Sequence, residues 1–187
     1  MAVENIYAEL CNSYRAIDDF RMKLLGFLPL ASGGIFAFFI HPDFLFDDKK
    51  IAVVKPLLPA IGIFGFLVTL GLFAFEIFGI RKCTSLILVG ASLEGQLGSK
   101  HGQFADRPEG VLGFIAEPLA AGIIYPAVMA AWAYFALQFS DRACIELCAF
   151  AVFGTFFLLS LVFIGWLKAI EIPQLKAKLN QVDDTGK

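Results

Sequence analysis

The sequence predicts an all-α, polytopic membrane protein with four transmembrane helices, and three observations lead to this prediction. Of the 187 residues, 58% are hydrophobic and 21 are phenylalanine, above the apolar share of roughly 45–50% in soluble domains. The mean hydropathy is +0.74. Four stretches are apolar over about the length that a helix needs to cross a bilayer. We expect these stretches to form a single membrane domain covering residues 1–187.

Residues 4–23 are expected to form an amphipathic helix on the cytoplasmic side, because apolar residues recur at every third or fourth position. Four charged residues end this helix directly before the first span, residues 24–40: Asp18, Asp19, Arg21 and Lys23. One interpretation is an interfacial collar that sets the depth of the chain in the bilayer. The other is a group of salt-bridge partners, near the inner mouth, for three residues of the second helix: Arg81, Lys82 and Glu94.

The second span, residues 57–80, contains a single charged residue and is followed by a helix-compatible segment that reaches residue 97. The span is therefore expected to continue as a cytoplasmic extension. Small and polar residues at seven-residue spacing lie along one slowly turning line of such a helix, because the drift is only about 20° per step. With near neighbours on the same face, this polar stripe comprises Gly62, Gly65, Thr69, Glu76, Cys83 and Glu94.

The polar stripe has two interpretations. Small residues let helices approach closely, and an intramembrane carboxylate must face protein or water because hydrocarbon cannot solvate it. The stripe is then either a packing seam, with Glu76 paired to one Arg or Lys at the inner boundary, or part of a pore wall. The opposite face carries Ile63, Leu67 and Phe78, which suit contact with lipid.

The third and fourth spans are expected at residues 114–138 and 143–167, followed by a cytoplasmic tail at residues 173–187. Glu117 precedes Pro118, so it would lie at the start of the third helix, where a carboxylate is favoured by the unpaired amides. Glu146 falls in the first turn of the fourth helix. It is either a carboxylate favoured by the same helix dipole or a charge at a pore entrance.

Positively charged residues predict the topology. Both ends of the chain and the segment after residue 80 carry eleven Lys and Arg residues, whereas the two connections on the other side carry Lys49, Lys50, Lys55 and Arg142. Such a bias places the positive side in the cytoplasm. The predicted location is the plasma (inner) membrane, with both termini cytoplasmic.

No catalytic, metal or cofactor site is predicted. The four cysteines show no CxxC or CxxH spacing, and His41 and His101 are expected on opposite sides of the membrane. No nucleophile with a base and no pair of acids occurs at suggestive spacing, so we do not expect an enzyme. The net charge of −2 and the lack of a basic patch with interleaved aromatic residues give no indication of a nucleic-acid partner.

These features favour a homo-oligomeric channel or pore. If the second helix lined a symmetry axis, Thr69 and Glu76 would form rings, and acidic rings prefer cations. Movement of the cytoplasmic extension would then gate the pore. The alternative is a membrane-resident sensor or effector subunit that docks a soluble cytosolic partner, an architecture analogous to small membrane proteins of bacterial defence systems. The expected partners are the lipid bilayer, further copies of the chain and, in the alternative, that soluble protein.

Overall fold

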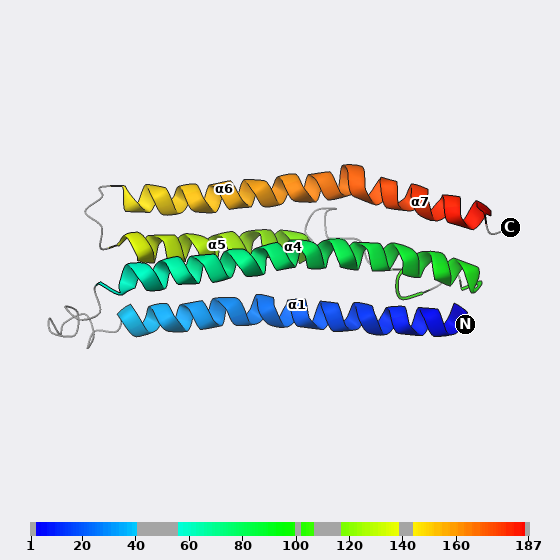
Figure 1. Cartoon of the computed structure of the whole chain (residues 1–187), viewed down its shortest axis with the longest axis horizontal. Helices are drawn as coiled ribbons and strands as arrows, with labels where there is room; N and C mark the ends of the chain where they lie inside the picture. The colour runs from blue at the N-terminus through cyan, green and yellow to red at the C-terminus, as the bar shows by residue number, and fades with distance from the viewer. Residues whose placement is uncertain (1–2, 41–55, 100–101, 107–116, 139–143, 186–187) are drawn as a thin grey trace. The chain divides into compact units, whose positions relative to one another are not determined.

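The computed structural model describes residues 3–40, 56–99, 102–106, 117–138 and 144–185, and every regular element in these ranges is a helix. The elements are α1 (Val3–Ile40), α4 (Leu58–Gln96), α5 (Glu117–Leu137), α6 (Ile145–Trp166), the π-helical turn η1 (Leu167–Glu171) and α7 (Ile172–Thr185) (Figure 1). Four helices are long and apolar enough to cross a membrane. The predicted all-α class and the number of candidate spans are therefore confirmed.

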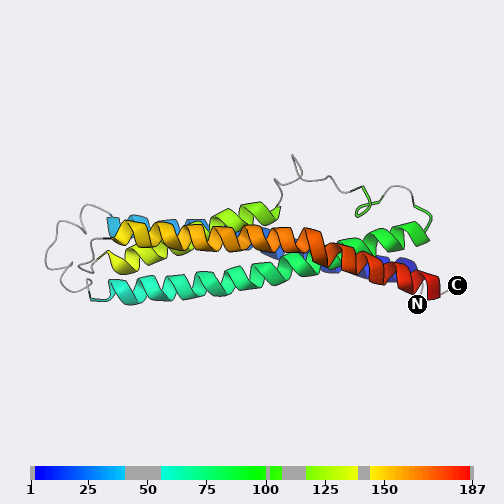
Figure 2. The ribbon, with the colours of Figure 1, turned by 90° about the horizontal axis from the view of Figure 1, so that it is seen from above.

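At both ends of the chain, segments that were predicted separately join into longer helical runs. The amphipathic N-terminal stretch and the first span form one continuous helix, α1, which contains Pro29. Between residues 4 and 25 the chain has neither glycine nor proline to end a helix. At the other end of the chain, η1 joins α6 directly to α7, and the ribbon in Figure 2 runs through without a break. The helix therefore continues through Pro173, near the start of α7 and of the segment that was expected as a separate tail.

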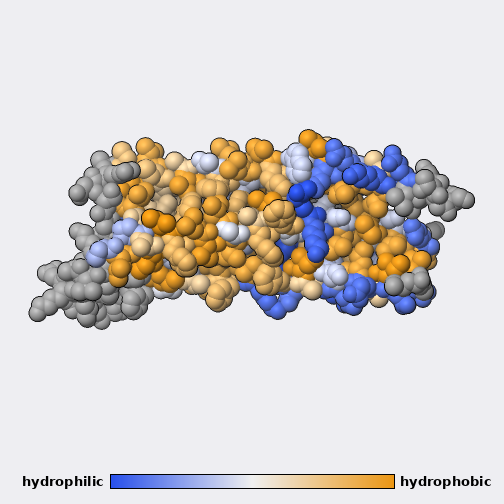
Figure 3. Space-filling model, in the orientation of Figure 1, coloured by the Kyte–Doolittle hydropathy of each residue, from blue (hydrophilic) through white to orange (hydrophobic). Residues whose placement is uncertain are grey.

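The chain divides into two compact units. Unit 1 comprises Met1–Met22, Glu76–Leu119 and Leu161–Lys187, and unit 2 comprises Lys23–Phe75 and Ala120–Ser160. In the space-filling view, hydrophilic residues gather over the helices of unit 1, whereas unit 2 presents a mainly hydrophobic surface (Figure 3). On this face, unit 2 thus has the surface expected of membrane spans, and unit 1 carries most of the polar surface.

Unit 2 is held together by small residues packed against aromatic rings and backbone. A Cβ on Gly62 would lie 2.6 Å from the backbone nitrogen of Ala136, and a Cβ on Gly65 would overlap the ring of Trp132. The ring of Phe36 packs on Trp132 with centroids 4.7 Å apart. Close approach of this kind supplies the van der Waals contacts that join helices in a bilayer.

Unit 1 has an apolar core of its own. It is formed by the buried residues Leu10, Cys11, Tyr14, Cys83 and Phe104. The helix α4 ends beside it in a Schellman arrangement, in which Gly98 has φ +73° and the Ser99 N–H donates to the Glu94 carbonyl (3.0 Å). This turn directs the chain back toward α4, where residues 102–106 cover the core.

Candidate functional site

The polar stripe is buried along α4. In unit 2, Gly62, Gly65 and Thr69 are buried, and in unit 1 the exposed fractions of Glu76 and Glu94 are 0% and 2%. Cys83 lies in the core of unit 1. On the opposite face of α4, Ile63, Leu67 and Phe78 are exposed, at 55%, 57% and 67%. The structure therefore turns the stripe toward other segments of the same chain.

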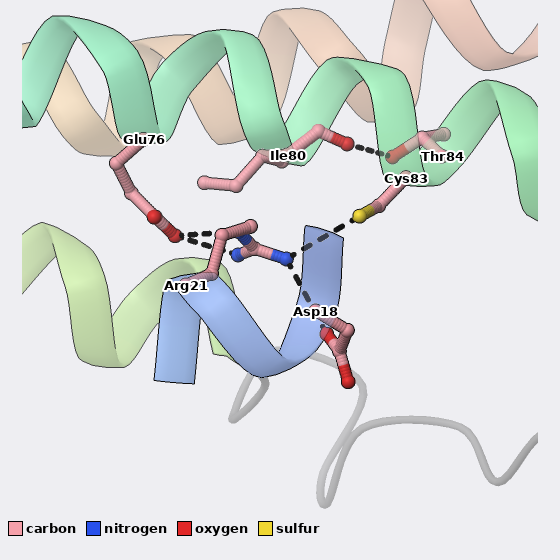
Figure 4. Close-up of polar contacts among 6 residues, drawn as sticks. All are labelled: Asp18, Arg21, Glu76, Ile80, Cys83 and Thr84. Carbon is pink, nitrogen blue, oxygen red and sulfur yellow. Dashed lines mark hydrogen bonds and ion pairs between the residues drawn. The ribbon is translucent and has the colours of Figure 1, made fainter. Parts of the chain in front are cut away.

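Glu76 is paired with Arg21, which projects from α1 (Figure 4). Nε and Nη2 of Arg21 both donate to Oε1 of Glu76, at 3.0 Å and 2.6 Å. Nη1 of the same guanidinium lies 3.7 Å from Sγ of Cys83 and 3.7 Å from Oδ1 of Asp18. A single cation therefore joins two acidic residues and one thiol at the base of unit 1.

Gly79 makes room for this pair, because a Cβ at this position would lie 2.9 Å from Cδ of Arg21. The small residue allows the arginine side chain to lie flat on α4 and reach Glu76 one turn earlier. Since a buried charge is costly unless it is paired and hydrogen-bonded, the glycine and the two charged residues form one structural unit.

The other candidate inner-mouth residues take different partners. Nε of Arg81 donates to Oε1 and Oε2 of Glu171 at 2.8 Å and 3.0 Å, and its guanidinium lies 5.5 Å from the ring centre of Trp166. Asp19 and Lys82 are exposed. The structure thus pairs Arg21 with Glu76, and Arg81 with the π-helical turn rather than with the charged cluster of α1.

Glu94 forms the second polar centre of unit 1. Its Oε1 accepts hydrogen bonds from the Tyr7 hydroxyl (2.6 Å) and the Phe104 N–H (3.0 Å), and its Oε2 accepts one from the Ala105 N–H (2.8 Å). A Cβ on Gly102 would collide with this carboxylate. The three donors come from α1 and from the segment after α4, so Glu94 ties both to α4.

The hydrogen bonds at Glu94 shift the pKa of both side chains. Burial alone would raise the pKa of the Glu94 carboxyl, but the bonds from Tyr7 and from the backbone of residues 103–105 outweigh it and lower the pKa below its ordinary value. The same bond to Glu94, followed by burial, raises the pKa of the Tyr7 hydroxyl. At neutral pH the pair is therefore an ionised carboxylate bonded to a neutral phenol.

Phe104 packs over this centre and closes it. Its ring meets Tyr7 and Tyr14 edge to face, with centroids 6.0 Å and 5.4 Å apart, and it occupies the space that a side chain on Gly90 would need. Gln103 adds a hydrogen bond from Arg15 (3.4 Å). We call residues 102–106 with Glu94 and Tyr7 the Glu94 lock.

Sequence reasoning missed the partners in this lock. The segment of residues 98–110 has the glycine and charge content of a linker, and Tyr7 lies among ordinary amphipathic positions. One signal was present: Phe104 is the single aromatic residue in that polar segment, and an aromatic side chain in a polar loop gains from burial.

The boundary carboxylates differ from these centres. Glu146 is exposed on α6 and borders a groove of about 470 Å³ between α5 and α6, whose lining includes Ala127 and Ala131. The side chain of Glu117, the first residue of α5, lies outside the described residues. Within the described ranges, no group of three or more His, Cys, Asp or Glu could hold a metal ion.

Comparison of the chain with protein-family profiles, with curated proteins and with solved structures returned no match.

Proposed function

We propose that this chain is a membrane-resident docking subunit, of the sensor or effector type, whose unit 1 presents a surface to a soluble cytosolic partner. The observation that carries the proposal is the Glu94 lock, which fixes α1, α4 and residues 102–106 to one another outside the most apolar stretches. Helix ends that only connected membrane spans would not need this buried network of hydrogen bonds or the apolar core beside it.

The lock favours recognition because it fixes the arrangement of its parts before a partner arrives. A preorganised surface avoids the ordering cost that flexible segments meet on binding. In unit 1, exposed side chains of α1 and α7 offer acidic, amide and basic groups, among them Glu9, Asn12, Lys176 and Lys178. A mixed polar surface of this kind suits a soluble protein better than lipid.

The distribution of positive charge supports a cytoplasmic position for unit 1. Lys and Arg residues in its described parts are Arg15, Arg21, Arg81, Lys82, Lys168, Lys176 and Lys178. The positive-inside rule assigns such a side to the cytoplasm. Both chain ends belong to unit 1, as expected for four spans in the plasma membrane.

A homo-oligomeric, cation-preferring channel is the second candidate. The favouring observation is that few residues of α6 are buried within one chain, so this helix could contact further copies. Against it, Thr69 and Glu76 are buried inside the chain. Rings of these residues would form only if α4 rotated away from its present contacts.

Site-specific photo-crosslinking in cells separates the two candidates. A photoreactive residue at Asn12 or Lys178, both exposed in unit 1, is expected to capture one soluble protein in fixed stoichiometry. The matched control is Phe150, which is 74% exposed in unit 2 and should capture lipid or the chain itself. Cation flux through liposomes that contain this chain and no other protein, together with no captured partner in cells, would refute docking and support the channel.

A further inference from the structure

The helix α6 is the least covered of the four candidate membrane spans. In its most apolar window 6% of the residues are buried, compared with 22%, 28% and 44% in the other three. We call six exposed positions, which recur at alternating intervals of three and four residues, the α6 seam: Cys148, Ala151, Thr155, Leu158, Val162 and Gly165. The seam is about 26 Å long at 1.5 Å per residue, close to the roughly 30 Å of hydrocarbon in a bilayer.

The α6 seam has the spacing of a helix–helix contact. A mean repeat of 3.5 residues keeps two helices in contact along a left-handed supercoil. Four of the six side chains are those of Cys, Ala, Thr and Gly, whereas exposed positions beside the seam carry Leu147, Phe150 and Leu159, at 67%, 74% and 53%. Acyl chains conform to large side chains, but small ones at this spacing let a second helix backbone approach closely.

The middle of the seam holds a hydroxyl group without an internal partner. Thr69 and Ser160 are buried, and each donates to the carbonyl four residues earlier at 2.8 Å. Thr155 is exposed and makes no hydrogen bond within the part of the chain that the structure describes. Because hydrocarbon offers no hydrogen-bonding group, this hydroxyl gains from a partner on another helix.

A second copy of the chain supplies that partner by symmetry. The distribution of Lys and Arg sets one orientation for every copy, so the α6 helices of two copies run parallel. A two-fold axis along the bilayer normal then sets each seam position against its equal, and one Thr155 hydroxyl donates to the other. An acyl chain has no donor or acceptor to offer there. We propose that this chain forms a parallel dimer through the α6 seam, whether or not unit 1 docks a soluble protein.

Oxidative cross-linking in lipid-diluted membranes tests which face of α6 meets the second copy. The exposed cysteines, Cys144 and Cys148, are first replaced by serine, and the other two are buried. With copper(II) phenanthroline as the oxidant, Thr155→Cys in this background should give a covalent dimer, because a disulfide joins Cβ atoms about 4 Å apart. Phe150→Cys, roughly 140° away around the helix, is the matched control and should stay monomeric.

The close approach is tested by the dimer fraction in vesicles, measured by single-molecule photobleaching over a series of protein-to-lipid ratios. Gly165→Leu adds bulk to the seam and should remove most of the dimer. Gly71→Leu on α4 is the matched control, because a Cβ at either exposed glycine meets nothing within 4 Å. Thr155→Val, which removes the hydroxyl and keeps the shape, should weaken dimerisation about threefold, the average for a hydrogen bond between membrane helices.

Equal cross-linking of Thr155→Cys and Phe150→Cys would indicate random collision and overturn the proposal. A Gly165→Leu chain that dimerised as well as Gly71→Leu would do the same, as would a Thr155→Val chain that dimerised like the wild type. A wild-type chain that stayed monomeric at every protein-to-lipid ratio would also overturn it, since lipid alone would then cover the seam.

Discussion

Replacing either partner of the buried Arg21–Glu76 pair should strongly destabilise the chain, and replacing both should restore most of the loss. The exposed fractions of the two side chains are 4% and 0%, so Arg21→Met leaves a carboxylate without its cation and Glu76→Leu leaves a guanidinium without its anion. Breaking a buried pair in this way costs about 3–5 kcal/mol of unfolding free energy. The double variant, with apolar side chains of similar volume, should lose much less.

The Arg81–Glu171 pair supplies the internal comparison, because the Arg81 side chain is 43% exposed. Arg81→Met leaves the Glu171 carboxylate, which is 14% exposed and keeps some contact with water, whereas Arg21→Met leaves the fully buried carboxylate of Glu76. Exposed pairs are worth about 0–1 kcal/mol. The contact with Trp166 adds about 0.5–1 kcal/mol at an exposed site. Arg81→Met should therefore cost at most about 2 kcal/mol, less than Arg21→Met.

The assay is reversible unfolding of the purified chain in mixed micelles, followed by tryptophan fluorescence and analysed as a double-mutant cycle. We expect a coupling energy of about 3 kcal/mol between Arg21 and Glu76. If the losses of unfolding free energy in the two single variants simply added in the double variant, Arg21 and Glu76 would not be coupled. Burial would then not make an unpaired charge at this site costly. The same would follow if Arg81→Met cost as much as Arg21→Met.

Three further predictions concern both units. Gly62→Ala should destabilise unit 2, because the new Cβ would lie 2.6 Å from backbone atoms of Ala136. Gly71→Ala on the same helix has nothing within 4 Å of its Cβ, so it should stabilise the fold by about 0.5–1 kcal/mol. Thermal unfolding in detergent compares the two variants. Phe104→Ala should open the Glu94 lock, so that trypsin cleaves the segment after α4 faster than in the wild type while α5 and α6 stay intact. Stability should also fall at both ends of the pH range. Because the pKa of Glu94 is lowered, its contribution to the unfolding free energy is complete above the ordinary pKa of 4.5 and is lost as pH falls through the pKa in the folded state. Because the pKa of Tyr7 is raised, its contribution is complete below the ordinary pKa of 10.0 and is lost as pH rises through the pKa in the folded state. Unfolding midpoints measured across pH should show both limbs, and a Glu94→Gln variant that kept the same acid limb would contradict this assignment.

Local periodicity explains why the helices and the buried face of α4 could be predicted. Residues seven apart share a face of any α-helix, so Gly62, Thr69 and Glu76 had to lie together whatever surrounded them. Their small or polar side chains also indicated that this face avoids lipid. These inferences need only the geometry of one helix, which the sequence specifies without knowledge of its neighbours.

The partners of that face could not be predicted in the same way, because they depend on how two helices are aligned along their length. Glu76 was expected to pair with one Arg or Lys at the inner boundary, and Arg21 meets it because Gly79 leaves space for the arginine side chain. The π-helical turn that brings Glu171 to Arg81 adds a residue to one turn, which shifts the facing side chains. A periodic pattern read at 3.6 residues per turn does not contain that shift.

The pairing of Glu76 within one chain also bears on assembly. On the proposed topology, an acidic residue near the membrane boundary that already has a cation gains nothing electrostatically by joining a ring of identical residues. Like charges brought together would instead raise the cost of keeping each one ionised. Any association of copies is then better served by α6, whose apolar surface is exposed, and by the groove beside Glu146.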